Sequence, residues 1–368
     1  MVADAGALRV AIVHDWLNQF GGAEIVLQVF KSMFPEAPVF TSMYWPAAMP
    51  SMTDWDIRVS FMDRLPAIHQ RHQRYLPLYP VAFERFNFED YDLVLSNKSG
   101  FCHGVNTLPS TKHFCYCLAP TRYLWQTEAY LAQEKVGGPE RAGLQMMLPW
   151  LRWWDRRAAQ RRVDDFAAIS HEIQSRIRGY YDRDATVIFP PVDLSRFKVL
   201  QEPVEEYFLV LSRLVPYKRI DIAVEAFARL GLPLVIIGDG RDRARLEAMA
   251  GANVRFLGRQ PDEVVQSYLS GCQALIWPGL EDFGLAPVEA QASGRPVIAY
   301  AAGGALDTVV DGVTGTFFYE QSSEALADVV DSFDATVFDP AVLRDHAAQF
   351  DVSRFRERIL DWIGVSIN

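Results

Sequence analysis

Long apolar runs are missing from this sequence. None of its 368 residues lies in a stretch of about 18 apolar residues, the length that a membrane-spanning helix requires. The first residues show no basic segment followed by a long apolar run, so we expect no secretory signal peptide. Fixed-period repeats and low-complexity segments are absent as well. These absences exclude fibrous and membrane-spanning classes and favour a globular, cytoplasmic protein.

Cysteine is scarce. The four residues Cys102, Cys115, Cys117 and Cys272 are too few for a disulfide framework. Cys115 and Cys117 stand on the same face of an expected strand and lack the two-residue gap of zinc and redox motifs. We therefore expect buried, reduced thiols.

Positive charge is in the minority. The chain carries 36 Lys and Arg against 46 Asp and Glu, a formal net charge of -10, which argues against a nucleic-acid binder because phosphate would be repelled. Residues 1–200 hold 22 basic against 21 acidic side chains, and the rest hold 14 against 25. The first half therefore has enough basic side chains to form a local cationic surface, which the net charge of the whole chain does not reveal.

What the chain does contain is a series of short apolar runs. They lack polar alternation and are separated by helical stretches, which predicts parallel sheets covered on both faces. The expected strands are 8–13, 39–42, 57–62, 93–96, 114–118, 166–170 and 186–189, then 208–212, 234–237, 254–257, 274–277, 297–300 and 316–318.

A proline-containing stretch, 189–207, interrupts this rhythm and is the expected interdomain linker. Half of the residues are hydrophobic, so the chain has material for two cores. We predict an α/β protein of two Rossmann-like, doubly wound domains, residues 1–198 and 199–350. The helical pattern in 351–368 is expected to pack back on the first domain, because its large apolar side chains share one face.

The stretch 274–294 carries two carboxylates, Glu281 and Glu289, after an expected strand. Pro287 suits the first position of a helix, which places Glu289 in the first turn. A helix start offers backbone N–H groups and the positive end of the helix dipole, a setting for phosphate across residues 283–286. Two carboxylates beside phosphate suit the hydroxyls of a nucleotide sugar. An ordinary acidic loop before a capped helix is the competing interpretation.

Other polar residues follow neighbouring strands, where open parallel sheets bind their ligands. Arg213 and Lys218 come after the eighth apolar run and suit the charges of a diphosphate. Gly258 and Arg259 follow the tenth run, a position suited to a nucleobase edge. Gly303-Gly304 follows a later run, and glycines there let backbone approach a ligand closely.

Longer motifs connect these positions. The second half contains SRLVPYKR, GDG, VRFLGR, EDFGLAPVEAQASGRPVIAY and AAGGALDTV, and the first half contains HDWLNQFGGAE, YDLVLSNKSG and CYCLAPTRYLW. The first set resembles the retaining family 4 glycosyltransferases of GT-B fold. The second set is similar to GDP-mannose-dependent mannosyltransferases of bacterial O-antigen and exopolysaccharide assembly. The resemblance covers essentially the whole chain and implies two domains facing a central cleft.

The resemblance implies a role for each matching position. Glu281 would hold sugar hydroxyls, Glu289 the ribose hydroxyls, and Arg213 with Lys218 the diphosphate. The expected catalytic residues are Glu281, Arg213 and Lys218. The expected donor-binding residues are Gly21, Gly22, Gly258, Arg259, Asp282, Phe283, Gly284, Leu285 and Glu289, and the expected acceptor-side residues are His14, Asp15, Arg122 and Tyr123.

The implied reaction is metal-independent transfer of a hexose with retention of configuration. GDP-mannose is the expected donor, and a UDP-sugar or GDP-fucose is the alternative. Cationic side chains and a helix start would stabilise the departing diphosphate, so no cofactor is expected. Asp54-Trp55-Asp56 matches the metal-binding pattern of the other major glycosyltransferase fold, but the chain around it does not. Retaining glycosidases use a nucleophilic carboxylate, whereas the usual account of this family is front-side attack assisted by the leaving phosphate.

Two positions depart from the family. Leu118 stands after CYC, where relatives commonly carry a His that contacts the donor sugar. His14 and Arg122 are the candidates to compensate. Asp307 stands where relatives often have Glu, and we assign it no role.

Two clusters in the first half combine aromatic and cationic side chains. Both suit an anionic membrane surface, although the second also fits a helix with its Trp residues in the core. With the resemblance, they predict a polyprenyl-diphosphate-linked saccharide as acceptor and a protein peripheral to the inner face of the plasma membrane. The first cluster contains Arg64, His69, Arg71, His72, Arg74 and Arg85, and the second is WLRWWDRRAAQRR from Trp150.

Three rival functions compete with this interpretation. A nicotinamide-dependent oxidoreductase should show a three-glycine fingerprint, but Gly238-Asp239-Gly240 is followed by Arg243 in place of the third glycine. An exported sugar-binding protein of two lobes would need a signal peptide. A non-catalytic nucleotide-sugar-binding relative is the third.

Overall fold

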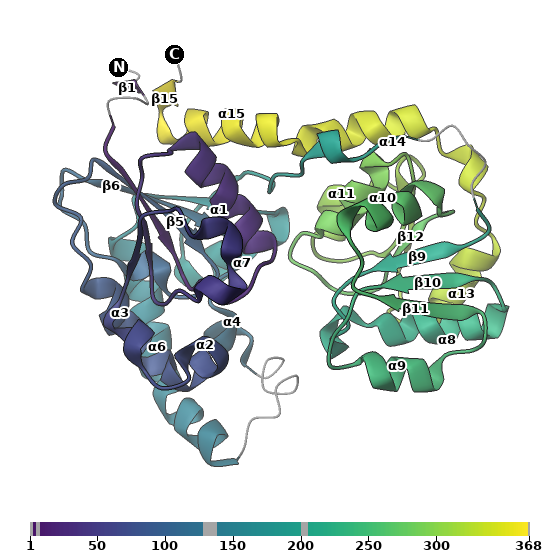
Figure 1. Cartoon of the computed structure of the whole chain (residues 1–368), viewed down its shortest axis with the longest axis horizontal. Helices are drawn as coiled ribbons and strands as arrows, with labels where there is room; N and C mark the ends of the chain where they lie inside the picture. Colours follow the sequence, from purple (N-terminus) through teal and green to yellow (C-terminus); the bar gives the residue numbers. More distant parts are fainter. Residues whose placement is uncertain (1–2, 5–7, 128–137, 200–204, 367–368) are drawn as a thin grey trace. The chain divides into compact units, whose positions relative to one another are not determined.

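The chain forms two compact α/β units. The computed structural model describes residues 3–4, 8–127, 138–199 and 205–366 (Figure 1). One unit comprises Met1–Pro191 with Phe355–Asn368, and the other comprises Val192–Arg354.

The division falls inside the proline-containing stretch, ahead of the expected boundary between 198 and 199. The Val192 N–H donates to the Phe350 carbonyl at 2.8 Å, and the Arg344 guanidinium donates to the Phe197 carbonyl at 2.9 Å. These bonds attach the start of the stretch to the second unit. Residues 200–204 of the stretch lie outside the described residues.

The first unit is built on a seven-stranded parallel sheet with the strand order β4-β3-β2-β5-β6-β7-β8. Strands β2, β3 and β5 are buried along their whole length, which explains why their sequences lack polar alternation. The strands are β2 (Val10–His14), β3 (Val39–Thr41), β4 (Ile57–Val59), β5 (Leu93–Lys98), β6 (Lys112–Cys117), β7 (Asp165–Ala168) and β8 (Thr186–Val187).

Helices and short 3-10 turns pack around this sheet (Figure 1). Phe30 of α1 packs edge-on against Tyr116 with ring centroids 5.7 Å apart, and Phe355 of α15 contacts both rings. A separate cluster joins Tyr79 of α3 to Trp154 of α6. The helices are α1 (Gly22–Met33), α2 (Ile68–Arg71), α3 (Tyr79–Glu84), α4 (Arg122–Trp125), α6 (Gly138–Arg161), α7 (His171–Tyr181) and α15 (Val352–Ile363), and β1 (Ala3–Asp4) pairs with β15 (Val365–Ser366).

The second unit is built on a six-stranded parallel sheet with the strand order β11-β10-β9-β12-β13-β14. Its strands are β9 (Phe208–Leu211), β10 (Leu234–Ile237), β11 (Val254–Gly258), β12 (Leu275–Trp277), β13 (Val297–Tyr300) and β14 (Gly315–Phe318). They agree with the predicted runs to within one or two residues at each end.

Helices α8, α9 and α13 lie on one face of the second sheet, and α10 and α11 lie on the other (Figure 1). The apolar face of α8 enters the core through Ile222 and Phe227, and Gly231 ends the helix with φ of +70°. The helices are α8 (Ile220–Leu230), α9 (Arg243–Met249), α10 (Asp262–Gly271), α11 (Leu285–Ala292), α12 (Ala305–Thr308), α13 (Ser323–Asp331) and α14 (Pro340–Ala347).

Both sheets reverse their strand order at one point. The chain starts in a middle strand, runs to one edge, and then crosses to the other half, so the reversal lies between β2 and β5 in the first sheet and between β9 and β12 in the second. At such a point the loops beyond the carboxyl ends of the two strands diverge and leave room for a ligand. These loops are therefore where each unit is expected to carry its site.

Two further expectations concern thiols and membrane spans. Cys102, Cys115, Cys117 and Cys272 are all buried and form no disulfide with one another, as predicted. Across the described part of the chain, no helix has the length and apolar character that a bilayer crossing requires.

Candidate functional site

Lys218 and Glu281 meet at the reversal point of the second sheet. Lys218 ends the 3-10 turn η7 (Pro216–Lys218) after β9, and Glu281 lies in the loop after β12. Their side chains form an ion pair and are only 13% and 11% exposed. Because charges withdrawn from water are costly unless they are paired, each group depends on the other in the absence of a ligand.

Aromatic rings surround the Lys218 ammonium. Its Nζ lies 5.2 Å from the ring centroid of Trp277 and 5.5 Å from that of Tyr217, distances at which the face of a ring attracts a cation. Trp277 is 6% exposed, and its indole N–H has no acceptor among the described residues. The Trp277 N–H beside the ion pair is therefore a buried hydrogen-bond donor without an acceptor.

Glycines let the neighbouring loops pack backbone against backbone. A Cβ at Gly303, where φ is +62°, would collide with the Glu281 carbonyl, and one at Gly304 would collide with the Phe283 backbone. The Gly304 N–H donates to the Glu281 carbonyl at 2.9 Å. The Gly303-Gly304 pair therefore lets two loops approach each other, and its close approach to a ligand stays a prediction.

The Gly-x-Gly turn after β10 has a similar packing role. A Cβ at Gly238 would collide with the Ser212 carbonyl, and one at Gly240 with the Leu214 carbonyl. Both carbonyls belong to the loop after β9, so this turn supports the segment that leads to Lys218.

Helix α11 begins two residues earlier than the sequence suggested. Pro287 is its third residue, where a backbone N–H would lack an intrahelical acceptor, so proline costs nothing there. Glu289 therefore lies in the second turn of the helix, which corrects its placement in the first. Gly284 forms the N-cap with φ of +96°, and no side chain caps the helix. The start of α11 is consequently suited to an external anion.

Glu289 is half-buried on α11. Desolvation raises the pKa of its carboxyl from 4.5 to about 7, and the Asp262 carboxylate adds to this, while the Arg196 guanidinium opposes it. Arg196 is itself paired with Asp262 at 2.6 Å, so its effect on Glu289 is reduced. Glu289 consequently changes charge near neutral pH.

This pKa predicts a pH-dependent stability. Because the pKa is about 7 in the folded state and 4.5 otherwise, the folded chain binds an extra proton between these values. The stabilisation is complete below pH 4.5 and is lost as the pH rises through about 7, on the order of 1–2 kcal/mol after allowance for partial exposure. We therefore expect the difference in Tm between the unmodified chain and Glu289→Gln to decrease in thermal melts as the pH is raised through this range. Glu263→Gln, which changes an exposed carboxylate of α10, should show no such trend. If the Tm of Glu289→Gln ran parallel to that of the unmodified chain over this pH range, the raised pKa of Glu289 would be contradicted.

The cations and glycine predicted for the donor lie along the same sheet edge. Arg213 is exposed and donates to the Tyr217 hydroxyl at 2.9 Å. Gly258 has φ of +69°, and its carbonyl accepts from the Gly238 N–H at 2.9 Å. Arg259 follows it and is exposed. These residues share the edge with the ion pair without contacting it.

The residues between Glu281 and α11 are mostly turned into the unit. Asp282 and Phe283 are 8% and 4% exposed, and the Phe283 ring packs against Phe350 with centroids 5.6 Å apart. Any contact from Phe283 to a ligand must therefore come from its backbone. Leu285 is half-buried as the first residue of α11.

His14 occupies the reversal point of the first sheet and is 1% exposed. Its Nε2 lies 3.2 Å from Glu24 Oε1, and its Nδ1 lies 3.3 Å from the Asn97 amide nitrogen. Since the amide nitrogen can only donate, Nδ1 accepts and Nε2 donates to Glu24. A Cβ at Gly21 would lie 3.5 Å from the other Glu24 oxygen, and α1 begins at the exposed Gly22. His14 thus supports the start of α1 from inside.

Asp15 has a structural role that the sequence did not reveal. It is fully buried, and its two carboxylate oxygens accept the backbone N–H groups of residues 99–102 at 2.6 to 2.8 Å. With both oxygens occupied, Asp15 holds the loop after β5. We expected Asp15 on the acceptor side, and the structure corrects this: its carboxylate supports that loop.

A buried Lys98 ties the ends of β5 and β6 to α6. Its Nζ donates to the Ala119 carbonyl at 3.3 Å and to the Thr121 hydroxyl at 3.2 Å. Thr121 in turn donates to Asp155 at 2.8 Å. Burial raises the pKa of the Asp155 carboxyl, and Lys98 opposes that rise. This network fixes the segment that leads into α4.

The remaining first-unit positions lie at the same edge. Arg122 and Tyr123 open α4 and are half-buried, and the Tyr123 ring lies 6.2 Å from that of Trp16. Leu118 is half-buried, and its N–H donates to the Lys98 carbonyl at 2.7 Å.

One aspartate of the Asp54-Trp55-Asp56 pattern, which we do not expect to bind metal, has another partner. Asp56 pairs with Arg58 at 2.8 Å. Among the described residues, no group of three His, Cys, Asp or Glu side chains gathers at metal-binding distance.

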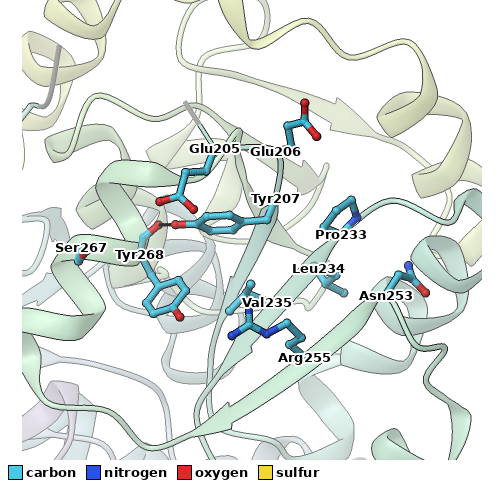
Figure 2. A pocket seen from close by; sticks show the side chains of 10 residues that line it. All are labelled: Glu205, Glu206, Tyr207, Pro233, Leu234, Val235, Asn253, Arg255, Ser267 and Tyr268. Carbon is cyan, nitrogen blue, oxygen red and sulfur yellow. Dashed lines mark hydrogen bonds between the residues drawn. The ribbon is translucent and has the colours of Figure 1, made fainter. Parts of the chain in front are cut away.

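A pocket of about 360 Å³ opens at the end of the second sheet opposite to the ion pair (Figure 2). It lies beside the amino ends of β9, β10 and β11, where Tyr207 donates to the Tyr268 carbonyl at 2.9 Å. Arg255 and the carboxylates of Glu205 and Glu206 line it. None of the predicted site residues contributes to this pocket.

The family comparison concerns the unit that carries the ion pair. Residues 192–334 match the model of the family described as glycosyl transferases group 1. This match makes the region similar to a group 1 glycosyl transferase domain. The matched region, called the group 1 domain below after that family model, contains β9 to β14, the Lys218–Glu281 pair and α11.

Curated relatives match over a similar length. An uncharacterized glycosyltransferase of Methanocaldococcus jannaschii is 29% identical over 157 residues, which cover 41% of this chain and 44% of the relative. D-inositol 3-phosphate glycosyltransferase of Mycobacterium tuberculosis is 33% identical over 167 residues, which cover 39% of this chain and 35% of the relative. The match thus spans less than half the length of these relatives.

Solved structures match nearly the whole chain. HepE from Anabaena in complex with UDP-glucose has a TM-score of 0.70 at 18% identity, with 97% of this chain and 99% of that chain covered. Sucrose-phosphate synthase from Thermosynechococcus elongatus has a TM-score of 0.72 at 18% identity, with 96% and 98% covered. At this identity the likeness concerns the fold, which is the predicted GT-B fold of two Rossmann-like domains.

Proposed function

We propose that the chain is a retaining glycosyltransferase that uses a nucleotide sugar. The observation that carries the proposal is the Lys218–Glu281 pair at the reversal point of the group 1 domain. The pair joins a cation suited to a diphosphate with a carboxylate suited to sugar hydroxyls. The test is a mass-spectrometric screen of nucleotide sugars against synthetic lipid-linked acceptors, and absence of transfer from every donor would contradict the proposal.

The pairing itself favours a ligand that carries both groups. Without ligand, Lys218 and Glu281 neutralise each other in a site that is largely withdrawn from water. A nucleotide sugar supplies a diphosphate for the ammonium and hydroxyl donors for the carboxylate. It therefore replaces the ion pair without leaving either charge unpaired, which a free sugar cannot do.

The proposed chemistry needs no protein nucleophile. The bond between the anomeric carbon and the diphosphate oxygen breaks while the acceptor oxygen bonds to the same face of the sugar, and the acceptor proton passes to the leaving phosphate. Lys218, Arg213 and the uncapped start of α11 would stabilise the negative charge that develops on the diphosphate. Glu289 would bind the ribose, and Glu281 would orient the sugar. No metal or other cofactor is assigned.

The choice of base is the next question. GDP-mannose is the donor that we propose, with a UDP-sugar as the alternative because HepE, at 18% identity, is described in complex with UDP-glucose. A bound nucleotide stabilises the folded chain in proportion to the logarithm of its concentration over Kd.

We therefore expect GDP to raise the Tm more than UDP at equal concentration. A tenfold difference in Kd corresponds to about 1.4 kcal/mol of stabilisation, or roughly 3–6 °C for a domain of this size. Differential scanning fluorimetry with both nucleotides provides the measurement, and AMP serves as a control for nonspecific binding. A larger shift with UDP would replace the proposed donor by a UDP-sugar.

For the acceptor we propose a polyprenyl-diphosphate-linked saccharide. The support is the pair of aromatic and cationic clusters in the first unit, which suit a protein that works at a membrane surface. A chain that binds nucleotide sugars but transfers from none of them would instead be a binding-only relative.

A further inference from the structure

We infer that the outward face of α6 docks on an anionic lipid bilayer. Met146, Trp150 and Trp153 are 81%, 43% and 57% exposed. Their spacing of four and three positions places them on one stripe of the helix. Trp154, by contrast, is buried in the core cluster. The expectation of Trp residues in the core therefore holds for one ring, while two rings face outward.

Cations continue this outward face toward the end of the helix. Arg156, Arg157 and Arg161 are exposed, and the Arg157 guanidinium lies 5.4 Å from the centre of the Trp153 ring. Asp155 is the acidic residue among positions 145–161, and it is fully buried against Thr121. Between positions 145 and 161 the exposed side chains of α6 are therefore apolar, cationic or, at Gln145 and Gln160, neutral, and none is acidic, although the whole chain carries -10.

This composition matches the boundary layer of an anionic membrane. Tryptophan places an apolar ring with a polar N–H at the level of lipid headgroups, and arginine binds phosphate through a planar fork. Exposed rings of this size cost free energy in water unless something covers them. Because the whole chain is net negative, a face that exposes cations and no acidic side chain is suited to approach anionic lipid first.

The inward side of α6 is anchored in the core of the first unit. Leu148 and Leu151 of α6 lie in the core cluster. The Trp154 indole donates to Glu84 of α3 at 2.7 Å, and Arg162 pairs with the same carboxylate at 2.7 Å. The first half of α6 also extends beyond the other helices of its unit (Figure 1). The outward face of α6 therefore has a fixed orientation within its unit in the absence of a membrane.

The histidines of the other aromatic and cationic cluster add little to its positive charge. His72 is 5% exposed, and burial lowers its pKa to about 4, so it carries no charge near neutral pH. His69 pairs with Asp63 at 3.0 Å. The exposed arginines Arg64, Arg71, Arg74 and Arg85 remain, and Arg71 with Arg74 supplies a comparison for the test.

The test is binding to vesicles, and it does not require sugar transfer. The full chain is sedimented with vesicles of equal parts phosphatidylcholine and phosphatidylglycerol, and with pure phosphatidylcholine. Binding is expected to the first and to be much weaker to the second. Arg156→Gln with Arg157→Gln should weaken it about 25-fold, since each cation near an anionic surface contributes roughly a factor of five. Trp150→Gln with Trp153→Gln should weaken it at least about tenfold.

Two control variants remove equal charge elsewhere. Arg229→Gln with Arg255→Gln, in the second unit, should bind like the unmodified chain. Arg71→Gln with Arg74→Gln should have a smaller effect than the α6 pair, and a larger effect would move the docking face to the other cluster and overturn the inference.

Quenching and size measurements complete the design. Lipids brominated in their acyl chains should quench tryptophan fluorescence, and Trp150→Phe with Trp153→Phe should lose most of this quenching. Absence of binding to both vesicle types would overturn the inference, as would light scattering that shows a dimer dissolved by the Trp150 and Trp153 variants. Nucleotide-induced Tm shifts in the same variants report on the group 1 domain separately, so a failure of the proposed function is distinguishable.

Discussion

Glu281→Gln is expected to lower the rate of sugar transfer about 100-fold or more, through the loss of charge-assisted hydrogen bonds to the donor sugar. Binding of the free nucleoside diphosphate should be retained or become tighter. The reason is the ion pair: without the carboxylate, Lys218 no longer has to leave a partner before it meets phosphate. The combination of lost transfer with undiminished nucleotide affinity separates this role from simple damage to the site.

Isothermal titration with GDP and UDP measures the affinity, and mass spectrometry measures the transfer. Glu320→Gln changes an exposed carboxylate two residues after β14, at the same end of the sheet, and should leave both quantities unchanged. Near-normal transfer by Glu281→Gln would remove Glu281 from the site.

Lys218→Met should lower transfer about 100- to 1,000-fold, the usual cost of removing one group that stabilises developing negative charge. Unlike the Glu281 variant, it should also weaken nucleoside diphosphate binding. The Glu281 carboxylate, 11% exposed, would be left without its cation, so the free energy of unfolding should fall by about 3 kcal/mol.

The double variant identifies the source of that instability. Lys218→Met with Glu281→Gln should recover most of the lost stability while transfer stays low, because no unpaired charge is left. Lys198→Met removes an exposed lysine of the same unit and should change neither stability nor transfer. Equal stability of Lys218→Met and the unmodified chain would show that the pair contributes nothing to the fold.

Much of the fold could be predicted because buried parallel strands carry a strong local pattern. All of the predicted runs overlap a strand, and 234–237 and 297–300 agree at both ends. The run 57–62 was too long, since its second part is the 3-10 turn η3 (Phe61–Arg64), which the Ser60 hydroxyl caps. Apolar composition alone does not distinguish these two shapes. Strand order was beyond reach, because it depends on crossovers between segments far apart in the chain.

The site was predictable in its residue types but not in its contacts. The positions of Lys218 and Glu281 after strands placed them at one edge, yet only the strand order brings β9 beside β12. Trp277 looked like an ordinary strand residue, since nothing local shows that its N–H lacks an acceptor.

The buried network of the first unit was missed for a related reason. Lys98 and Asp155 resemble surface charges in the sequence, because the groups that neutralise them are distant along the chain. Asp15 shows the opposite error: a carboxylate at the end of a strand invited a functional role, while its four backbone partners lie in another loop.

The interlocked glycines of the second unit bear on the entropy of binding. Gly238, Gly240, Gly303 and Gly304 allow contacts between the loops after β9, β10, β12 and β13 that no side chain would permit. The conformational freedom of these loops is therefore given up when the chain folds. A ligand that arrives later does not have to order them, so more of its contact energy is available for affinity and for the transition state.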